Sequence, residues 1–348
     1  MENLLELNHV TFSFHTYGGV VQAVRDVSFN IKPGEIVGVV GESGCGKSVT
    51  AQCILKLNPE PPGFFGEGSS IKYNNAEIVA MSDKEMRKIR GKEIGFIFQD
   101  PMTSLNPTMK IGAQIEEIFV GDKTISRQEK EKRAIEILEL VGISDAKRRY
   151  NQYPHELSGG MKQRVMIAIA LVGKPSIVIA DEPTTSLDVT IEAQILDLLK
   201  ELREKLGISI ILITHDLGVI AKLCDRVLVM YGGKIIERGT VEEIFYTTKH
   251  PYTNGLLNSV ARLSSDKNQE LTPIDGTPPD LFNPPKGCPF AARCEYCMEI
   301  CTEQAPLEYE VNNNHKTSCW LMHPNAPKVD LTYHIKLSNE KSEEVTNG

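Results

Sequence analysis

Short apolar runs separated by polar turns fill most of the chain, and their spacing predicts strands first and helices later. Near the start, strands are expected in LLELNHVTFSF, in AVRDVSFNI and, after the turn KPGE, in IVGVVG. The last run is typical of a buried central strand. Between about residues 101 and 172 the apolar positions take helical spacing: Ile111, Ile115, Ile118 and Phe119, then Ala134, Ile137, Leu138 and Val141. We therefore expect an α/β domain with an inserted helical subdomain.

Strand signals return in SIVIAD and SIILITHD, which are separated by the helical TIEAQILDLLKELREKLG. This strand, helix, strand order predicts a parallel sheet. The segment RVLVMYGGKIIERG predicts a hairpin that turns at Gly232 and Gly233. The predicted organisation is one domain over residues 1–262, a Pro-rich linker with a cysteine-rich extension over residues 263–330, and a polar tail over residues 331–348 for which we expect disorder.

Composition narrows the class of protein. The chain has 348 residues, of which 41% are hydrophobic and 24% charged, as in soluble globular proteins, and its apolar runs are too short to cross a bilayer. The start, MENLLELNHV, lacks the basic and apolar regions of a secretory signal, so we expect a cytosolic protein. Thiols stay reduced there, which favours metal binding over disulfides for clustered cysteines. A net charge of -8 argues against a nucleic-acid partner.

The segment GESGCGKS, residues 41–48, fits G-x-x-x-x-G-K-[ST] and lies between an apolar strand and a helical stretch. Its glycines allow backbone N–H groups to approach phosphate oxygens closely. Lys47 is expected to bridge the β- and γ-phosphates and Ser48 to ligate Mg²⁺. A glycine-rich turn that matches by chance is the alternative, which the flanking strand and helix disfavour. The nucleotide-binding residues predicted here are Gly41, Ser43, Gly44, Cys45, Gly46, Lys47, Ser48 and Val49.

The segment SIVIADEP places Asp181 and Glu182 at the end of an apolar strand. Asp181 is the expected Mg²⁺ partner, and Glu182 the base that orients and deprotonates the attacking water. An acidic pair at a strand end is by itself more often a helix cap or a solvated turn. Together with the phosphate-binding segment, the catalytic interpretation is favoured.

The segment LSGGMKQR offers a second place for phosphate, because Ser158, Gly159 and Gly160 open a helix with a hydroxyl and bare backbone amides. One ATP does not need two such sites from one chain. We therefore expect the second site to serve the nucleotide of a partner subunit. The alternative is a plain helix N-terminus with Ser158 as cap.

The motifs GESGCGKS, FQD, LSGGMKQR, IADEP, SLD and ITHD, in this order, resemble the nucleotide-binding subunit of ABC transporters over roughly residues 4–260. The family implies an α/β P-loop ATPase domain, with a mixed sheet, N-terminal antiparallel strands and an inserted helical subdomain. Met161 departs from the commonest signature, and SGGMKQR looks like the variant of the peptide-importer branch. The small-molecule P-loop kinases are a weaker alternative, because they leave LSGGMKQR unexplained.

The resemblance implies two subunits packed head to tail, with each ATP between one P-loop and the other signature. Gln99 would contact Mg²⁺ and the attacking water, and His215 the γ-phosphate; singly, either residue could be structural. Asp188 could likewise be only a helix cap. An aromatic residue of the N-terminal strands would stack on adenine, for which spacing favours Phe14 over Tyr17.

The tail segment GCPFAARCEYCMEIC and a later cysteine have the spacing C-x5-C-x2-C-x3-C-x17-C. Four thiolates suit Zn²⁺ or an iron-sulfur cluster, and spacing alone favours zinc. Together with HPYTNGLL and GTPPDLFNPPKG, the segment resembles the C-terminal extension of ATPase subunits of dipeptide and oligopeptide importers, a branch that includes nickel-uptake relatives. That resemblance implies a [4Fe-4S] cluster, with a structural role favoured over redox sensing and Cys297 as the spare thiol. The implied ligands are Cys288, Cys294, Cys301 and Cys319.

The predicted function is ATP hydrolysis that drives uptake of dipeptides or oligopeptides, or of nickel. The expected partners are a homologous ATPase subunit, as a heterodimer or a homodimer, two membrane permease subunits at the cytoplasmic face of the membrane and, indirectly, an extracytoplasmic substrate-binding protein. The alternative is a soluble ABC-type ATPase acting on nucleic acid or ribosomes with a zinc module. The net negative charge of the chain and the lack of a basic arm argue against this alternative.

Overall fold

The computed structural model describes residues 3–122, 124–185, 188–259 and 274–331. The chain divides into two compact units, each treated by itself below. Unit 1 takes residues 1–235 and 278–284, and unit 2 takes residues 236–277 and 285–348. Among the described residues, no helix is both long and apolar enough to cross a membrane. The predicted boundary after residue 262 lies outside the described residues, so it stays a prediction.

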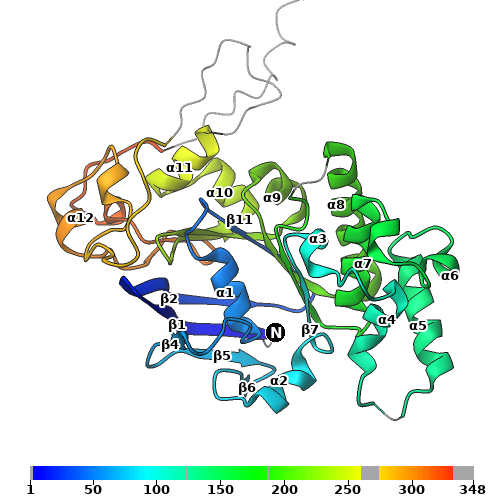
Figure 1. Cartoon of the computed structure of the whole chain (residues 1–348). Coiled ribbons are helices and arrows are strands. Elements are labelled where there is room, and N and C mark those ends of the chain that lie inside the picture. The colour runs from blue at the N-terminus through cyan, green and yellow to red at the C-terminus, as the bar shows by residue number, and fades with distance from the viewer. Residues whose placement is uncertain (1–2, 123, 186–187, 260–273, 332–348) are drawn as a thin grey trace, which may run out of the picture. The chain divides into compact units, whose positions relative to one another are not determined.

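An antiparallel sheet begins unit 1. It contains β1 (Leu5–Thr16), β2 (Gly19–Ile31), β4 (Gly63–Phe65), β5 (Ser70–Tyr73) and β6 (Ala76–Glu77), in the order β2-β1-β5-β6 with β4 paired to β1 (Figure 1). Leu5 pairs with Ile31 on one side and with Tyr73 on the other. The core side chains Leu7, Val10 and Phe12 are buried. The N-terminal strands predicted from the apolar pattern are present.

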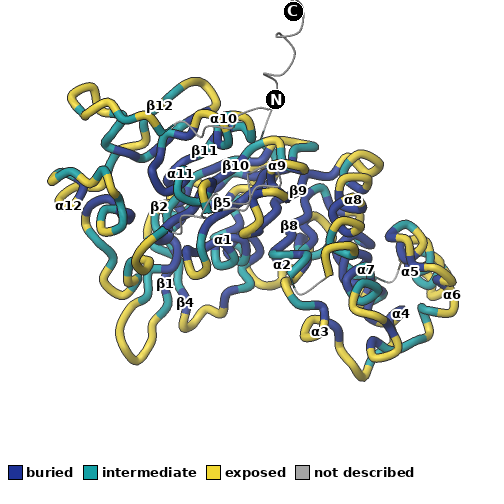
Figure 2. The backbone as a smooth tube through the Cα atoms, turned by 90° about the horizontal axis from the view of Figure 1, so that it is seen from above, coloured by how far each residue is buried: buried dark blue, intermediate teal, exposed yellow. Residues whose placement is uncertain are grey.

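The central sheet of unit 1 is parallel. Its order is β10 (Arg226–Tyr231), β3 (Ile36–Val40), β9 (Ser209–Ile213), β8 (Ile177–Asp181) and β7 (Ile94–Ile97). Every residue of β3, β8 and β9 is buried, as the uninterrupted apolar runs predict. Figure 2 shows β8 and β9 in the colour of buried residues. The adjoining helices are α1 (Lys47–Ile54), α2 (Asp83–Ile89), α8 (Val189–Leu206) and α9 (Leu217–Leu223). Because the strands are parallel, their carboxyl ends lie at one edge of the sheet.

Between β7 and β8 the chain is helical. The elements are α3 (Pro101–Ser104), α4 (Ile111–Glu116), η1 (Glu117–Phe119), α5 (Arg127–Leu140), α6 (Ala146–Arg149), η2 (Pro154–Glu156) and α7 (Gly159–Leu171). Of the apolar positions predicted to face a core, Ile118 is partly buried and the others are buried: Ile111, Ile115, Phe119, Ala134, Ile137, Leu138 and Val141. The helical periodicity therefore identified the inward faces of α4 and α5.

Unit 2 joins two stretches of chain that are far apart in sequence. β11 (Lys234–Thr240), which begins in unit 1, pairs through Glu237 and Arg238 with β13 (Lys316–Thr317), and β13 pairs with β12 (Tyr309–Glu310). The other elements are α10 (Val241–Tyr246), α11 (Pro251–Asn258), η3 (Ala291–Arg293), α12 (Glu299–Glu303) and η4 (Trp320–Met322). The cysteine-rich segment thus belongs to a unit that also contains α10 and α11.

Two glycines separate β10 from β11, as predicted. Gly232 and Gly233 have φ values of 55° and 79°, which a two-residue hairpin turn requires. The linker residues 278–284 belong to unit 1, where the N–H of Gln22 donates to the carbonyl of Leu281 at 2.9 Å. This part of the predicted linker is therefore held against β2.

Candidate functional site

The phosphate-binding segment forms a tight loop between β3 and α1. Gly41 and Gly46 have φ values of 151° and 100°. A Cβ on Gly41 would lie 2.2 Å from the carbonyl oxygen of Met230, and a Cβ on Gly46 would lie 2.4 Å from the carbonyl oxygen of Ala23. Only glycine fits both the backbone conformation and the space. Cys45, in the same loop, is buried, and burial raises the pKa of its thiol.

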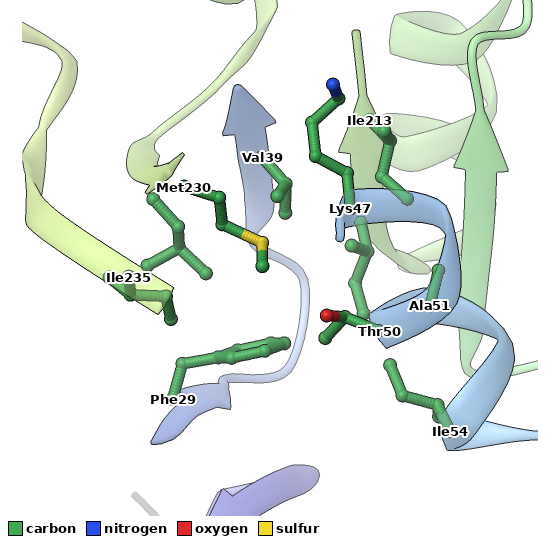
Figure 3. A pocket seen from close by; sticks show the side chains of 11 residues that line it. Phe29, Val39, Lys47, Thr50, Ala51, Ile54, Ile213, Met230 and Ile235 are labelled. Carbon is green, nitrogen blue, oxygen red and sulfur yellow. The ribbon is translucent and has the colours of Figure 1, made fainter. Parts of the chain in front are cut away.

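Lys47 is folded back over this loop. Its Nζ donates to the carbonyl oxygens of Gly41 at 2.8 Å and Glu42 at 3.0 Å, and the residue is only 6% exposed. Figure 3 shows its aliphatic stem beside a pocket lined by apolar residues such as Phe29, Val39 and Ile213, with the nitrogen pointing away from them. The apolar surroundings hold the stem, and the charged group remains at the loop, where an anion would be bound.

Ser48 and Asp181 are brought together from different elements. The hydroxyl of Ser48, in the first turn of α1, donates to Oδ1 of Asp181, the last residue of β8, at 2.9 Å. Asp181 is buried, and burial raises the pKa of its carboxyl group, whereas the hydrogen bond from Ser48 lowers it. A hydroxyl and a carboxylate at this separation are oxygen ligands suited to Mg²⁺.

Glu182 lies at the centre of a second group of contacts. Its Oε2 accepts hydrogen bonds from Nε2 of Gln99 at 2.8 Å and from the hydroxyl of Thr185 at 2.9 Å. Its Oε1 lies 3.5 Å from Nδ1 of His215. The structure therefore brings together the three residues predicted to be catalytic, Gln99, Glu182 and His215, just beyond the carboxyl ends of β7, β8 and β9.

The sequence interpretation gave no role to two residues of this site. Thr185 follows Glu182 by three positions in DEPTT, a spacing that signals a possible hydroxyl contact. Gln163, within LSGGMKQR, is 1% exposed and donates to the carbonyl oxygen of Pro183. Gln163 thus ties α7 to the segment that carries Glu182.

The signature residues open α7 at the surface. Ser158 is the N-cap, and its Oγ accepts from the N–H of Met161 at 3.4 Å. Ser158 and Gly159 are exposed, Gly160 is partly buried, and a Cβ on Gly159 would meet no atom within 4 Å. Ser158 therefore caps a helix, as expected if this segment were only a helix N-terminus. The same N-terminus is exposed and therefore also open to a ligand.

Asp188 of the SLD motif and the aromatic residues considered for adenine have clear local roles. Asp188 caps α8, since its side chain accepts from the N–H of Ile191 at 3.0 Å. Phe14 is partly buried and lies edge-on to Phe12, with ring centroids 5.2 Å apart, whereas Tyr17 is fully exposed. Stacking of adenine on Phe14 stays a prediction.

The cysteine-rich segment belongs to unit 2. Cys288, Cys301 and Cys319 are buried, Cys294 is partly buried and Cys297 is exposed, and all are free thiols. Burial, with a smaller contribution from the neighbouring thiols, raises the pKa of Cys288 to about 11 and the pKa values of Cys294 and Cys319 to about 12. Among the described residues, no group of three or more His, Cys, Asp or Glu side chains is arranged to hold a metal ion.

The backbone holds two of these cysteines together. The N–H of Cys288 donates to the carbonyl oxygen of Cys301 at 2.7 Å, and a Cβ on Gly287 would lie 2.2 Å from that same oxygen. A glycine before Cys288 is therefore required for the chain to pass α12 this closely.

Comparison with known proteins places this geometry in a family. Residues 24–185 match the family described as ABC transporter, and residues 236–301 match the one described as oligopeptide/dipeptide transporter, C-terminal region. The oligopeptide transport ATP-binding protein OppD of Bacillus subtilis is 56% identical over 338 residues, which are 97% of this chain and 94% of that protein. The dipeptide transport ATP-binding protein DppD of Bacillus subtilis is 53% identical over 95% of this chain and 98% of that protein.

Solved structures agree on the fold of the ATPase part. A dimeric ATP-binding cassette in a post-hydrolysis state, bound to ADP and Pi, matches with a TM-score of 0.60 and 32% identity, over 68% of this chain and 98% of that one. A dimeric bacterial ABC transporter cassette matches with the same TM-score and 33% identity, over 68% and 98% of the two chains. This chain therefore belongs to the ABC transporter family, among the ATP-binding proteins of oligopeptide and dipeptide transport.

Proposed function

We propose that this chain is the ATP-hydrolysing subunit of an importer of dipeptides or oligopeptides. The observation that carries the proposal is the convergence of Lys47, the Ser48–Asp181 pair and the Glu182 group at one edge of a parallel sheet. The relatives named above are transport ATP-binding proteins for oligopeptides and dipeptides, which supports peptides over nickel as cargo.

The phosphates of ATP would lie over the loop of residues 41–48. There Lys47 would exchange the two backbone carbonyls that it now contacts for phosphate oxygens. Ser48 and Asp181 would hold Mg²⁺, which supplies positive charge to the phosphate oxygens when bound. Phe14, on β1, would stack on the adenine ring.

Glu182 would act as the general base for the attacking water. Its carboxylate now accepts from Gln99 and Thr185, and either contact can be exchanged for a water molecule. Gln99 would hold that water from the other side, and His215, which is 67% exposed, would turn toward the γ-phosphate.

The signature Ser158, Gly159 and Gly160 would complete the site of a homologous subunit. This is supported by the exposed N-terminus of α7 and by the dimeric form of the solved cassettes. We infer a head-to-tail dimer, with a heterodimer as the favoured form, attached to two permease subunits at the cytoplasmic face of the membrane. An extracytoplasmic binding protein would deliver the peptide to the permeases.

We infer that Cys288, Cys294, Cys301 and Cys319 hold a [4Fe-4S] cluster, and we favour it over Zn²⁺. Support comes from the proximity of the four thiols within one unit, where the pKa values of Cys288, Cys294 and Cys319 are each raised in part by the charges of other cysteines of the group. A single zinc ion needs all four sulfurs at about 2.3 Å from the same metal. In a four-iron cluster each thiolate binds its own iron atom, which allows wider spacing. Its role would be to hold this proline-rich segment folded.

The cluster is tested by anaerobic purification, a visible absorption spectrum and analysis for iron, sulfide and zinc. We expect a brown protein with about four iron atoms per chain. Cys301→Ser should lose iron, whereas Cys297→Ser, which removes a neighbouring exposed thiol, should keep it. A colourless protein with one equivalent of zinc would overturn the cluster.

The transport function is tested in a host that lacks this gene and needs an amino acid supplied as a dipeptide or oligopeptide. We expect the wild-type gene to restore growth on the peptide and Glu182→Gln to fail, while both grow on the free amino acid. Uptake of radioactive nickel, measured in the same strains, should not change. Nickel uptake that depends on the gene, with no effect on peptide use, would contradict the proposed cargo.

A further inference from the structure

The backbone at Glu182 is strained, so its position depends on the contacts around it. Glu182 has a φ of 47°, in the left-handed region that residues with a side chain rarely adopt. Pro183 follows directly, and a proline favours extended backbone in the residue before it. Strained conformations of this kind persist only where the surrounding structure holds them. The groups that hold residues 182 and 183 therefore decide where the proposed base lies.

Hydrogen bonds lie on both sides of the strained residue. On the N-terminal side, the N–H of Glu182 donates to the carbonyl oxygen of Ile213, the last residue of β9, at 2.9 Å. On the C-terminal side, the carbonyl oxygen of Pro183 accepts from Nε2 of Gln163, which lies on α7. The first contact joins two backbone groups, whereas the second depends on one side chain. A substitution of Gln163 therefore releases the C-terminal side.

The contact between Gln163 and Pro183 is shielded from water. Gln163 is 1% exposed and Pro183 is buried. A buried carbonyl oxygen that loses its donor is costly, so the backbone is expected to move until this oxygen reaches another donor or water. The next residue, Thr184, stays tied to α8, because its hydroxyl donates to Oε1 of Glu192 at 2.9 Å. The expected movement is thus local to residues 182 and 183.

We propose that Gln163 is a positioning residue for ATP hydrolysis: by holding the carbonyl of Pro183, it keeps Glu182 in the left-handed conformation that directs its carboxylate to the attacking water. Because Gln163 is buried, it acts through Glu182 and not on the nucleotide. The inference rests on the proposed role of Glu182 as base. In the proposed dimer, α7 would then serve both ATP sites, with its N-terminus at the partner's nucleotide and Gln163 behind the base of its own chain.

Gln163→Met tests this role, because methionine has the same length and cannot donate to a carbonyl oxygen. On the purified full-length protein we expect kcat to fall roughly ten- to a hundred-fold, the loss that a misplacement of about 1 Å can cause. The KM for ATP should change by less than about two-fold, because ATP binding does not involve Gln163. Rates are expressed per bound ATP, so that unfolded protein does not contribute. A wild-type rate per bound ATP rules out the positioning role.

Gln163→Asn is a second test with a different risk to folding. Asparagine keeps the amide group but is one methylene too short for the contact with the carbonyl of Pro183. It should therefore lower kcat in the same range as Gln163→Met. A wild-type kcat in Gln163→Asn would likewise count against the contact as the cause.

A double-mutant cycle shows whether Gln163 acts through Glu182. Glu182→Gln removes the base, so the addition of Gln163→Met should cost no further rate, measured as radioactive phosphate released from labelled ATP. An equal fold loss in both backgrounds would show that Gln163 acts elsewhere, and the inference fails. If Glu182→Gln alone hydrolyses ATP at the wild-type rate, the proposed base fails. If Glu182→Gln is slow and Gln163→Met is not, only the role of Gln163 fails.

Gln114 provides the matched control. It is a buried glutamine of unit 1, 5% exposed, and its Nε2 donates to the carbonyl oxygens of Asn106 at 2.9 Å and Met109 at 3.0 Å. Gln114→Met also takes a donor away from backbone carbonyls, so it should lower the temperature of thermal unfolding while kcat stays at the wild-type value. A loss of kcat equal to that of Gln163→Met would show that the effect is not specific to Gln163.

Discussion

At the scale of single residues, the position of Glu182 depends on an unusual backbone. Its φ is 47°, a conformation that costs energy for a residue with a side chain, and its N–H donates to the carbonyl oxygen of Ile213 at 2.9 Å. The last residue of β9 thus fixes Glu182 at the carboxyl end of the sheet. Contacts with Gln99 and Thr185 then hold the carboxylate. This arrangement places the carboxylate at the same edge of the sheet at which the phosphate-binding loop follows β3.

Glu182→Gln is expected to cut ATP turnover by on the order of 10² or more, because an amide cannot accept the proton of the attacking water. The amide oxygen of glutamine can still accept the hydrogen bond from the hydroxyl of Thr185, so the local arrangement is kept and ATP binding should persist. Turnover and nucleotide binding are measured separately on the purified protein. Glu204→Gln, an exposed substitution on α8, is the control and should hydrolyse ATP at the wild-type rate. A wild-type rate in Glu182→Gln would remove this residue as the base.

At the scale of elements, one glycine sets how closely α4 and α6 pack. A Cβ on Gly112, in the first turn of α4, would lie 2.2 Å from the ring of Tyr150, which follows α6. The ring is fixed because its hydroxyl donates to Glu116 at 2.6 Å, and the N–H of Gly112 donates to the carbonyl oxygen of Tyr150 at 2.8 Å. Neither the ring nor the backbone can move without breaking a hydrogen bond.

Gly112→Ala is expected to destabilise the protein by about 1–3 kcal/mol, because overpacking outweighs the gain of about 1 kcal/mol in helix propensity. Thermal unfolding of the purified protein measures the change. In a Tyr150→Leu background the ring is absent, so Gly112→Ala should then be neutral or slightly stabilising. Equal losses in both backgrounds would show that the ring is not the cause.

At the scale of the whole molecule, buried polar contacts join chain segments that are far apart in unit 2. Glu237 of β11 accepts from the hydroxyl of Thr248 at 2.7 Å and lies 2.8 Å from Nε2 of His315, with His315 and Glu237 both almost completely buried. His250 caps α11 through Nδ1, which accepts from the N–H of Tyr252 at 3.1 Å, so its neutral ring carries the proton on Nε2. These contacts make unit 2 sensitive to protonation.

Burial lowers the pKa of His250 from an ordinary 6.5 to about 4, although the charge of Glu237 opposes the shift. The unfolded state therefore binds the proton more readily, so stability is full above about pH 6.5 and falls as pH decreases toward about 4. The loss attributable to His250 is about 3 kcal/mol. Trp320, the single tryptophan, lies in unit 2, and its fluorescence during urea unfolding measures the change.

The matched variant is His250→Asn, because asparagine also caps helices and does not titrate. Between pH 7 and pH 4.5 its stability should fall less steeply than that of the wild type. Parallel pH profiles would show that His250 does not protonate on unfolding.

The linear sequence determined the local features. Apolar spacing predicted the buried strands and the inward faces of α4 and α5, since a period of two or 3.6 is a property of neighbouring residues. The motifs around Lys47 and Ser158 likewise predicted helix starts, and the motif around Asp181 predicted the end of a strand, because each depends on a few consecutive residues.

Only the tertiary structure decided which distant residues meet. Gln99, Glu182 and His215 come from three separate segments and touch because β7, β8 and β9 are parallel neighbours. The pairing of β11 with β13 placed the cysteine segment in a unit with α10 and α11. Such contacts depend on strand order and on packing across the core, which no local pattern encodes. The kinds of residue at the site could therefore be identified from the sequence, whereas the residues that each of them contacts could be identified only from the fold.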